Sequence, residues 1–358
     1  MVKYLSPCDL HIHLRGTEYD TNYAQLAFED ARHVGLRVMA EMPNPLPQLV
    51  DANVIDNRFN ELSKYAYGTF DGSRQLVRHM INIGLTNDIY QVRDALRLIM
   101  NNTRLVKADK VFYTHSTGNM GILDEDYQRE IWKLKRDLGY KGVSMAHFED
   151  EKSYVGEFDY MNPMSHSLKQ CPEAELVQIE RQIKNAIDFQ FQGTFYVAHV
   201  SNPDTIKYLL PLKKKVDFEI IIEATWHHIF LNHDSYKTSG NLVKMNPPLR
   251  SKEMQAELLR HVLNGDVDII GTDHAPHPLD KKINTSNPYS GIPALLFWPK
   301  GIELLMNLGI NRMILNSLIF YTANRIFNLK IDPVEVEHHY QPDLWSRYGY
   351  NPFESIDL

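Results

Sequence analysis

The chain has 358 residues and a formal net charge of −7, with 43% hydrophobic and 23% charged residues, which is typical of a globular protein with a sizeable core. The acidic balance and the lack of a long basic run argue against a nucleic-acid or anionic-membrane surface. No stretch approaches the ~18 apolar residues of a membrane span, the segment before Asp9 leaves no room for a signal peptide, and two cysteines suit a reducing cytosol, so we expect a cytoplasmic protein.

Eight apolar, β-rich runs recur along the chain, and amphipathic segments lie between them. The predicted strands are 8–14, 35–42, 79–85, 106–113, 143–148, 194–200, 218–224 and 267–272. The predicted helices are 20–34, 88–101, 124–138, 173–190, 204–210 and 252–263. After residue 293 the chain is predicted to be helical through Asn328, and a short tail follows at about 329–358.

This alternation predicts the fold class. Strands that alternate with helices form βαβ units and a parallel sheet. Eight such units favour closure into an α/β barrel of the (β/α)₈ TIM type. No low-complexity linker divides the chain, so we expect one domain over residues 1–358.

The first predicted strand contains Asp9-Leu10-His11-Ile12-His13-Leu14-Arg15. Side chains of a strand alternate between its faces, which would put His11, His13 and Arg15 on one face. Two such imidazoles can bind one metal ion, although an isolated His-x-His pair is more often ordinary structure, by about two to one. The arginine strengthens the functional interpretation because a buried guanidinium requires an anionic partner.

Three further candidates lie at the ends of other predicted strands, where the active sites of such barrels are built. They are His147, His199 and Asp273. Each alone has an ordinary explanation, since such a histidine can be a hydrogen-bonded core residue and such an aspartate a helix cap. Together with His11 and His13 they favour zinc or a similar divalent ion with an open position for water.

These residues resemble the amidohydrolase superfamily, and in detail its dihydroorotase family. The resemblance extends from Asp9 to about Asn328. It is carried by the segment 9–15 and by Met42-Pro43-Asn44, Asn246-Pro247-Pro248-Leu249-Arg250, Gly271-Thr272-Asp273-His274-Ala275-Pro276-His277 and Thr322-Ala323-Asn324-Arg325-Ile326-Phe327.

The resemblance implies two divalent metal ions, with zinc expected. His11, His13 and Asp273 would hold one ion and His147 and His199 the other, and a lysine carboxylated by CO₂ would bridge them. Lys107 and Lys110 are three apart and face opposite ways on a strand. The family pattern of lysine, apolar residue and aromatic residue matches Lys110-Val111-Phe112, so we expect the carbamate on Lys110.

The resemblance also implies a reaction. A hydroxide that bridges the two metals would open the ring of dihydroorotate to N-carbamoyl-L-aspartate, a reversible step of pyrimidine (UMP) biosynthesis. Asp273 would be the catalytic acid–base group. Arg15, Asn44 and His277 would bind the substrate carboxylate, and Asn246 is a further candidate. The expected partner is this small molecule, and a homodimer is expected from the family.

Some segments depart from this pattern. The start close to Asp9 resembles a compact branch of the family without an N-terminal β-sandwich, whereas the segment 246–250 and Trp226-His227-His228 resemble the other branch. The loop at 114–121 does not match the paired-threonine loop of compact-branch enzymes, so no substrate contact is assigned there. We expect His227 and His228 to lie behind the site or in a loop rather than to bind metal.

Two other functions remain open. Hydantoinases, dihydropyrimidinases and allantoinases resemble the chain in their metal ligands, but they generally lack the arginine two residues after the second histidine. A catalytically silent barrel that serves as an assembly partner is the alternative from a different class. Such relatives usually lose metal ligands, whereas none of the six expected ones is missing here.

Overall fold

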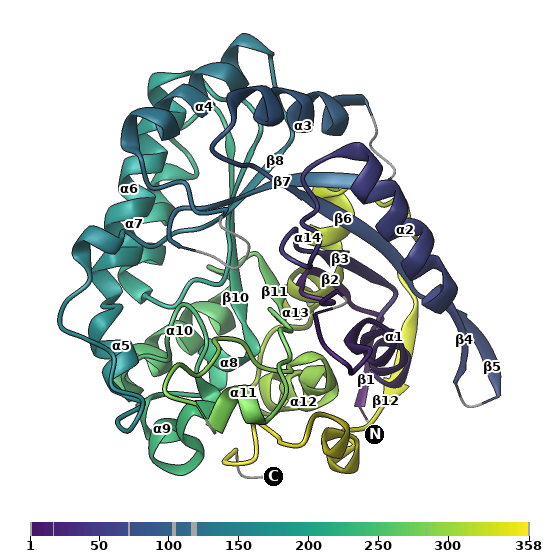
Figure 1. The fold of residues 1–358 in the computed structure, drawn as a ribbon. Coiled ribbons are helices and arrows are strands. Elements are labelled where there is room, and N and C mark those ends of the chain that lie inside the picture. Colours follow the sequence, from purple (N-terminus) through teal and green to yellow (C-terminus); the bar gives the residue numbers. More distant parts are fainter. Residues whose placement is uncertain are drawn as a thin grey trace.

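A parallel barrel sheet forms the centre of the computed structural model, which describes residues 2–16, 18–70, 72–101, 105–115, 120–283 and 285–356 (Figure 1). Its strands are β2 (Cys8–Ile12), β3 (Val38–Glu41), β6 (Arg78–Gly84), β7 (Val106–Phe112), β8 (Val143–His147), β9 (Thr194–Val197), β10 (Glu219–Thr225) and β11 (Ile269–Gly271). They lie in the sheet in chain order, and each pairs in parallel with the next. The eight predicted strands and the α/β barrel are confirmed, although β2, β3, β9 and β11 are clearly shorter than predicted.

The barrel closes between β2 and the residues after β11. The backbone N–H of Asp273 donates to the carbonyl of His11 at 3.0 Å, and the N–H of His13 donates to the carbonyl of His274 at 2.8 Å. These bonds join the first and last strands at their C-terminal ends. Closure therefore brings the His-x-His pair against Asp273.

Helices connect successive strands over the outside of the barrel, as parallel pairing requires (Figure 1). The six predicted helices are present as α1 (Tyr23–His33), α3 (Ile89–Asn101), α4 (Glu125–Asp137), α6 (Pro172–Asp188), α7 (Pro203–Leu212) and α10 (Lys252–Asn264). The region predicted to be helical up to residue 328 contains η3 (Leu295–Phe297), α12 (Trp298–Asn307), α13 (Arg312–Asn316), a π-helical turn η4 (Ser317–Tyr321) and α14 (Thr322–Ile326).

Helix α2 (Ala52–Ala66) lies outside the predicted elements. A charged residue, Arg58, belongs to its buried face. Arg58 donates to both carboxylate oxygens of the buried Glu41 on β3, at 3.0 and 2.7 Å. The buried face of α2 therefore contains an ion-paired arginine at a position where an amphipathic helix usually has an apolar residue, and this weakens the helical pattern in the sequence.

Several short elements also fall outside the prediction. They are the hairpin β4 (Tyr67–Phe70) and β5 (Ser73–Leu76), the helices α5 (Ser165–Lys169), α8 (Trp226–Phe230), α9 (His233–Ser239) and α11 (Asp280–Ile283), and the 3₁₀ turns η1 (Glu151–Ser153), η2 (Gly240–Val243) and η5 (Pro342–Tyr348). The segments that follow η2 and α11 lie at the C-terminal ends of the barrel strands. They supply Lys244, Asn246 and residues 287–291 to the wall of the barrel cavity.

The two ends of the chain meet beside the barrel. Strand β1 (Val2–Leu5) pairs antiparallel with β12 (Glu335–His338) from the tail. The Tyr348 hydroxyl donates to the buried carboxylate of Asp30 on α1 at 2.6 Å. The tail therefore packs on the barrel and on α1. No helix in the described ranges combines the length and apolar character that crossing a membrane requires.

Candidate metal and anion site

A cavity of about 630 Å³ opens at the C-terminal ends of the barrel strands. Active sites of (β/α)₈ enzymes lie at this end. All of the site residues predicted from the sequence line this one cavity: His11, His13, Arg15, Asn44, Lys110, His147, His199, Asn246, Asp273 and His277. The fold thus brings together residues that are as much as 266 positions apart in the sequence.

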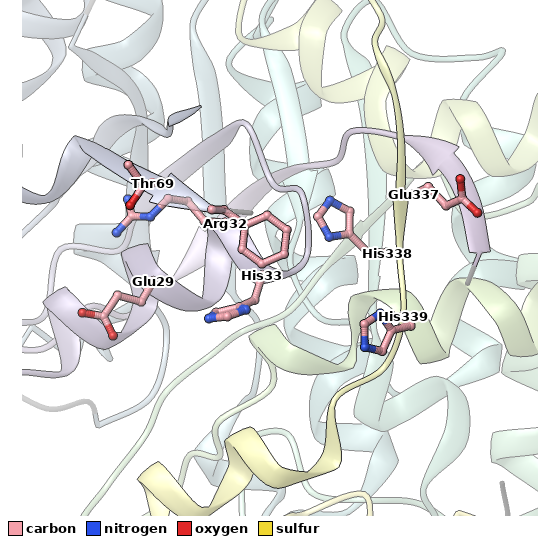
Figure 2. Close-up of a pocket in the computed structure, with 8 residues that line it drawn as sticks. Glu29, Arg32, His33, Thr69, Glu337, His338 and His339 are labelled. Carbon is pink, nitrogen blue, oxygen red and sulfur yellow. The ribbon is translucent and has the colours of Figure 1, made fainter. Parts of the chain in front are cut away.

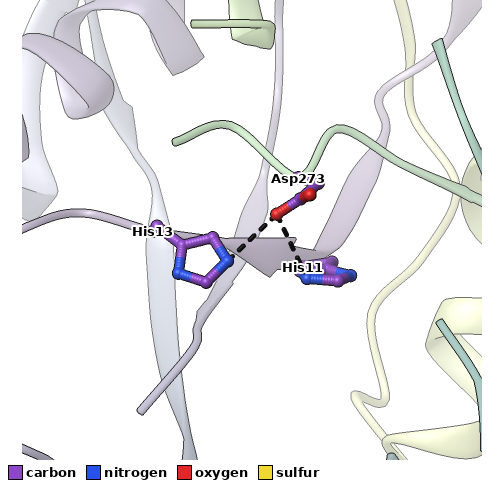
Figure 3. A group of neighbouring side chains, drawn as sticks. All are labelled: His11, His13 and Asp273. Atoms are coloured by element: carbon purple, nitrogen blue, oxygen red, sulfur yellow. Dashed lines mark ion pairs between the residues drawn. The ribbon is translucent and has the colours of Figure 1, made fainter. Parts of the chain in front are cut away.

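His11, His13 and Asp273 converge on one point of this cavity (Figure 3). Nε2 of His11 lies 3.3 Å, and Nε2 of His13 lies 3.0 Å, from Oδ1 of Asp273. Ligand atoms ~2.0–2.1 Å from a tetrahedral zinc ion would lie roughly 3.3 Å apart. The spacing fits a divalent metal ion, and among the described residues no other three histidine, cysteine or acidic side chains converge in this way.

A hydrogen-bond partner fixes the orientation of each imidazole. Glu223 Oε1 lies 2.8 Å from Nδ1 of His11, and Asn44 Oδ1 lies 2.5 Å from Nδ1 of His13. Because both oxygens are acceptors, each Nδ1 carries the proton and each Nε2 turns a lone pair toward Asp273. Three acceptors that face one another without a proton between them could hold a cation.

Burial and charge hold these ligands in the states that metal binding requires. Burial lowers the pKa of His13 to about 4, so its ring is neutral at pH 7. Burial by itself would raise the pKa of Asp273, but the neighbouring His11 and His13, whenever they carry a proton on the side facing it, outweigh that effect and hold it well below its usual range. The site therefore offers a neutral imidazole and a carboxylate anion.

A second histidine pair lies beside this group. Nδ1 of His147 is 3.0 Å from Nε2 of His199, and the ring centres of His199 and His11 are 5.2 Å apart. Glu149 Oε2 accepts from Nε2 of His147 at 2.7 Å, which leaves Nδ1 of His147 as an acceptor. The short distance between the two rings can be explained by a hydrogen bond from His199 to His147 as well as by a shared metal ion. A second metal ion at this histidine pair is therefore part of the proposed function.

Lys110 reaches the cavity from β7. Its side chain is buried, and its Nζ has no hydrogen-bond partner in the described ranges. Burial lowers the pKa of Lys110 to about 8. At pH 7 about 10% of such amines would be neutral, against about 0.03% for an ordinary lysine. Lys107 is half-buried and does not line the cavity, so of these two lysines only Lys110 reaches it.

Arg15 places a buried positive charge at another part of the cavity wall. Its Nε donates to the carbonyl of Pro276 at 3.0 Å, and one Nη donates to Nε2 of His277 at 2.8 Å. Tyr19 Oη lies 2.7 Å from Nδ1 of His277. Both acceptors of Arg15 are uncharged, and no ion pair joins it to a carboxylate of the described residues. An anionic ligand would complete this arrangement.

The sequence predicts that Arg15 faces the cavity because side chains of a strand alternate between its two faces. The structure gives a different reason for its orientation. Strand β2 ends at Ile12, and Arg15 has a left-handed backbone with φ of 60°. His199 and Asp273 share this feature, with φ of 38° and 46°. Such conformations cost about 1–3 kcal/mol each and persist where the surrounding structure holds them. The barrel rim therefore stores backbone strain at three cavity-lining residues.

The two predicted amide residues contact histidines. Asn44 accepts from His13, as described above. Asn246 Oδ1 lies 2.9 Å from Nε2 of His166, so its oxygen is engaged with that ring. Both amides line the cavity, and each retains an N–H₂ donor for a ligand.

The structure adds residues that the sequence analysis did not single out. Glu223 lies on β10, where one acidic residue in the apolar run Ile220-Ile221-Ile222-Glu223-Ala224 was the available signal. Tyr19 contacts His277, and Lys244 lines the cavity wall. No sequence spacing marks either residue as part of the site. His227 and His228 are buried and do not line the cavity, and residues 116–119 of the loop at 114–121 lie outside the described residues.

A second cavity, of about 720 Å³, lies away from the barrel mouth, between α1, the β4–β5 hairpin and β12 (Figure 2). Arg32, His33, His338 and His339 line it together with Glu29 and Glu337. Its histidines form no convergent metal-ligand group among the described residues. The chemistry expected from the sequence therefore belongs to the barrel cavity.

Sequence comparison finds dihydroorotases. The chain is 25% identical to the dihydroorotase of Archaeoglobus fulgidus over 98% of this chain and 82% of that protein. It is 26% identical to the dihydroorotase of Methanosarcina mazei over 98% of this chain and 79% of that protein. No family model matches the chain.

Comparison with solved structures finds the same barrel. An L-hydantoinase (dihydropyrimidinase) from Arthrobacter aurescens superposes with a TM-score of 0.75 and 18% identity, over 92% of this chain and 72% of that one. The dihydroorotase of Saccharomyces cerevisiae in complex with 5-fluoroorotic acid gives 0.73 and 18%, over 92% and 85%. The chain resembles dihydroorotases in sequence and has the fold of these amidohydrolases, and we conclude that it is a hydrolase.

Proposed function

We propose that the chain is a dihydroorotase, which interconverts dihydroorotate and N-carbamoyl-L-aspartate in pyrimidine biosynthesis. The observation that carries the proposal is Arg15, a buried cation without a carboxylate partner in the described ranges, in the same cavity as the His11, His13 and Asp273 group. Dihydroorotate has a ring carboxylate, whereas hydantoin and dihydrouracil have none. The dihydroorotase relatives support the same choice.

The chain's own residues would divide the work. Arg15, Asn44, His277 and Asn246 would bind and orient the substrate, with the Arg15 fork on the carboxylate. Asp273 would accept the proton of the attacking water and deliver it to the leaving ring nitrogen. Divalent ions, when bound, lower the pKa of water toward ~7 and polarise the amide carbonyl.

We propose two ions per chain, with zinc as the expected metal. His11, His13 and Asp273 would hold one, His147 and His199 the other, and a carbamate on Lys110 would join them. The unpartnered, partly neutral amine of Lys110 supports this assignment. Elemental analysis of protein purified without chelator should approach two divalent ions per chain. A reproducible value near one with full activity would contradict the two-metal arrangement.

A hydantoinase, dihydropyrimidinase or allantoinase remains the second candidate, because the hydantoinase structure has the same fold. The test is turnover of dihydroorotate beside hydantoin, dihydrouracil and allantoin by the metal-loaded protein. We expect dihydroorotate to give the highest kcat/KM. No turnover of any of the four, with a full complement of metal, would favour the catalytically silent alternative. A cytoplasmic homodimer stays a prediction.

A further inference from the structure

Lys244 is a second buried cation on the wall of the barrel cavity. It follows the turn η2, and its side chain is only 8% exposed. Its Nζ donates to Oγ of Ser290 at 2.6 Å and lies 5.1 Å from the centre of the Phe158 ring. No carboxylate of the described residues pairs with it. Two of the three N–H donors of this ammonium therefore have no acceptor in the described parts of the chain.

Apart from Lys110, whose Nζ also has no partner among the described residues, the other buried lysines differ in this respect. Lys135 pairs with Asp109 at 2.8 Å, and Lys282 donates to three backbone carbonyls at 2.8–2.9 Å. Lys300, which is 7% exposed, lies 3.3 Å from Glu303. A buried ammonium with one neutral acceptor is unfavourable in the free protein. Burial lowers the pKa of Lys244 to about 8, which expresses the same cost. Lys244 is thus poorly explained as a structural lysine.

Lys244 and Arg15 lie at the two ends of a short chain of contacts. Ser290 accepts from Lys244 through its hydroxyl, and its carbonyl lies 3.0 Å from Nε2 of His277. The same His277 nitrogen accepts from Arg15 at 2.8 Å. Lys244, Ser290, His277 and Arg15 therefore form one wall of the cavity, with a cation at each end and no acid of the described residues paired to either.

We propose that Lys244 is a second carboxylate-binding residue of this site, whose ammonium contacts the substrate carboxylate together with Arg15. A carboxylate has about four lone-pair positions, enough for the Arg15 fork and one ammonium. N-carbamoyl-aspartate keeps the same carboxylate after ring opening, so Lys244 would serve both directions of the reaction. This inference rests on the proposed dihydroorotase function.

The test measures binding of 5-fluoroorotate to the metal-loaded protein by calorimetry, for wild type, Lys244→Met and Lys300→Met. Lys300 is the matched control, because it is equally buried but lies outside the cavity. We expect Lys244→Met to weaken binding at least about tenfold, since one partner of a buried charge pair is lost. Lys300→Met should bind as wild type does, and Lys244→Arg should retain most of the affinity.

Two further readouts separate a ligand contact from a structural role. Uncharged 5-fluorouracil should bind wild type and Lys244→Met equally, even if weakly or undetectably in both. The thermal midpoint of ligand-free Lys244→Met should not fall below that of wild type, because the substitution removes an uncompensated buried charge. Wild-type affinity of Lys244→Met for 5-fluoroorotate would overturn the inference and leave the proposed function standing. A wild type that neither binds 5-fluoroorotate nor turns over dihydroorotate would overturn both.

Discussion

Asp273 combines several structural roles. Its backbone N–H closes the barrel, its backbone has a left-handed conformation, and its Oδ1 lies close to the Nε2 atoms of both His11 and His13. In the proposed mechanism the single carboxylate of Asp273 would both bind a metal ion and transfer a proton. A substitution that keeps the shape of the side chain but removes its basicity separates metal binding from proton transfer.

Asp273→Asn should therefore remove turnover while much of the metal remains bound. The amide oxygen can still act as a weak ligand but cannot carry a proton, and loss of such catalysis typically costs about 10²–10⁴-fold in rate. Turnover and metal content are measured on the same preparation, with the exposed Asp126→Asn on α4 as control. Near-normal turnover would mean that another group, such as His277, moves the proton.

Glu223 is expected to act through His11. It accepts from Nδ1 of His11 at 2.8 Å and also from the Tyr196 hydroxyl at 2.6 Å. Glu223→Gln should weaken metal binding by about 10–100-fold, the usual effect of losing the partner of a metal-binding histidine. Chelator competition measures this affinity. Glu219→Gln, on the same strand but without a histidine contact in the described ranges, is the control, and equal metal affinity in both variants would contradict the assignment.

At the scale of elements, the register of β7 determines which lysine faces the cavity and would carry the proposed carbamate. Lys110 points into the cavity, and its pKa is lowered to about 8, so the neutral amine that reacts with CO₂ becomes more abundant as pH rises from 6 toward 8. Reactivation of metal-free protein by metal and bicarbonate should rise over the same range.

The modification itself can be located with ¹³C-bicarbonate and carbamate NMR. Lys107→Ala should keep the carbamate signal and Lys110→Ala should lose it, with activity of the second variant partly restored by small carboxylates. A signal that disappears in Lys107→Ala instead would show that β7 has another register.

The strands were predictable because their signal is local, whereas much of the site depends on non-local contacts. Each buried strand is an apolar run, so all eight could be found from the sequence. Helix α2 escaped because Arg58 on its buried face pairs with Glu41, which no local pattern reveals. Likewise, Arg15 reaches the cavity through a left-handed turn beyond β2, and Lys244 through an irregular connection. Histidines at strand ends are visible in a sequence, but isolated cations in loops are not.

At the scale of the whole molecule, the tail holds α1 in place. Tyr348 and Arg347 both donate to the buried Asp30, and Phe353 stacks on Phe297 with ring centres 3.9 Å apart. Tyr348→Phe should lower the free energy of unfolding by about 1–3 kcal/mol, because a buried acceptor loses a hydrogen bond. Denaturant unfolding measures the change against the exposed Tyr90→Phe, and kcat should not change. Equal stability of the two variants would show that the tail contact contributes little.

We propose that one cavity combines the metal-binding group His11, His13 and Asp273, which would perform hydrolysis, with the buried cation Arg15, which would select a carboxylate. The most direct measurement is kcat/KM of wild type, Arg15→Met and Arg15→Lys on dihydroorotate and on uncharged dihydrouracil. Wild type should prefer dihydroorotate, and Arg15→Met should lose about 2–5 kcal/mol of transition-state stabilisation on it, with little effect on dihydrouracil. Arg15→Lys should rescue only in part, because an ammonium cannot form the two-pronged contact. A wild type that prefers dihydrouracil, or an Arg15→Met variant with intact dihydroorotate turnover, would contradict the account.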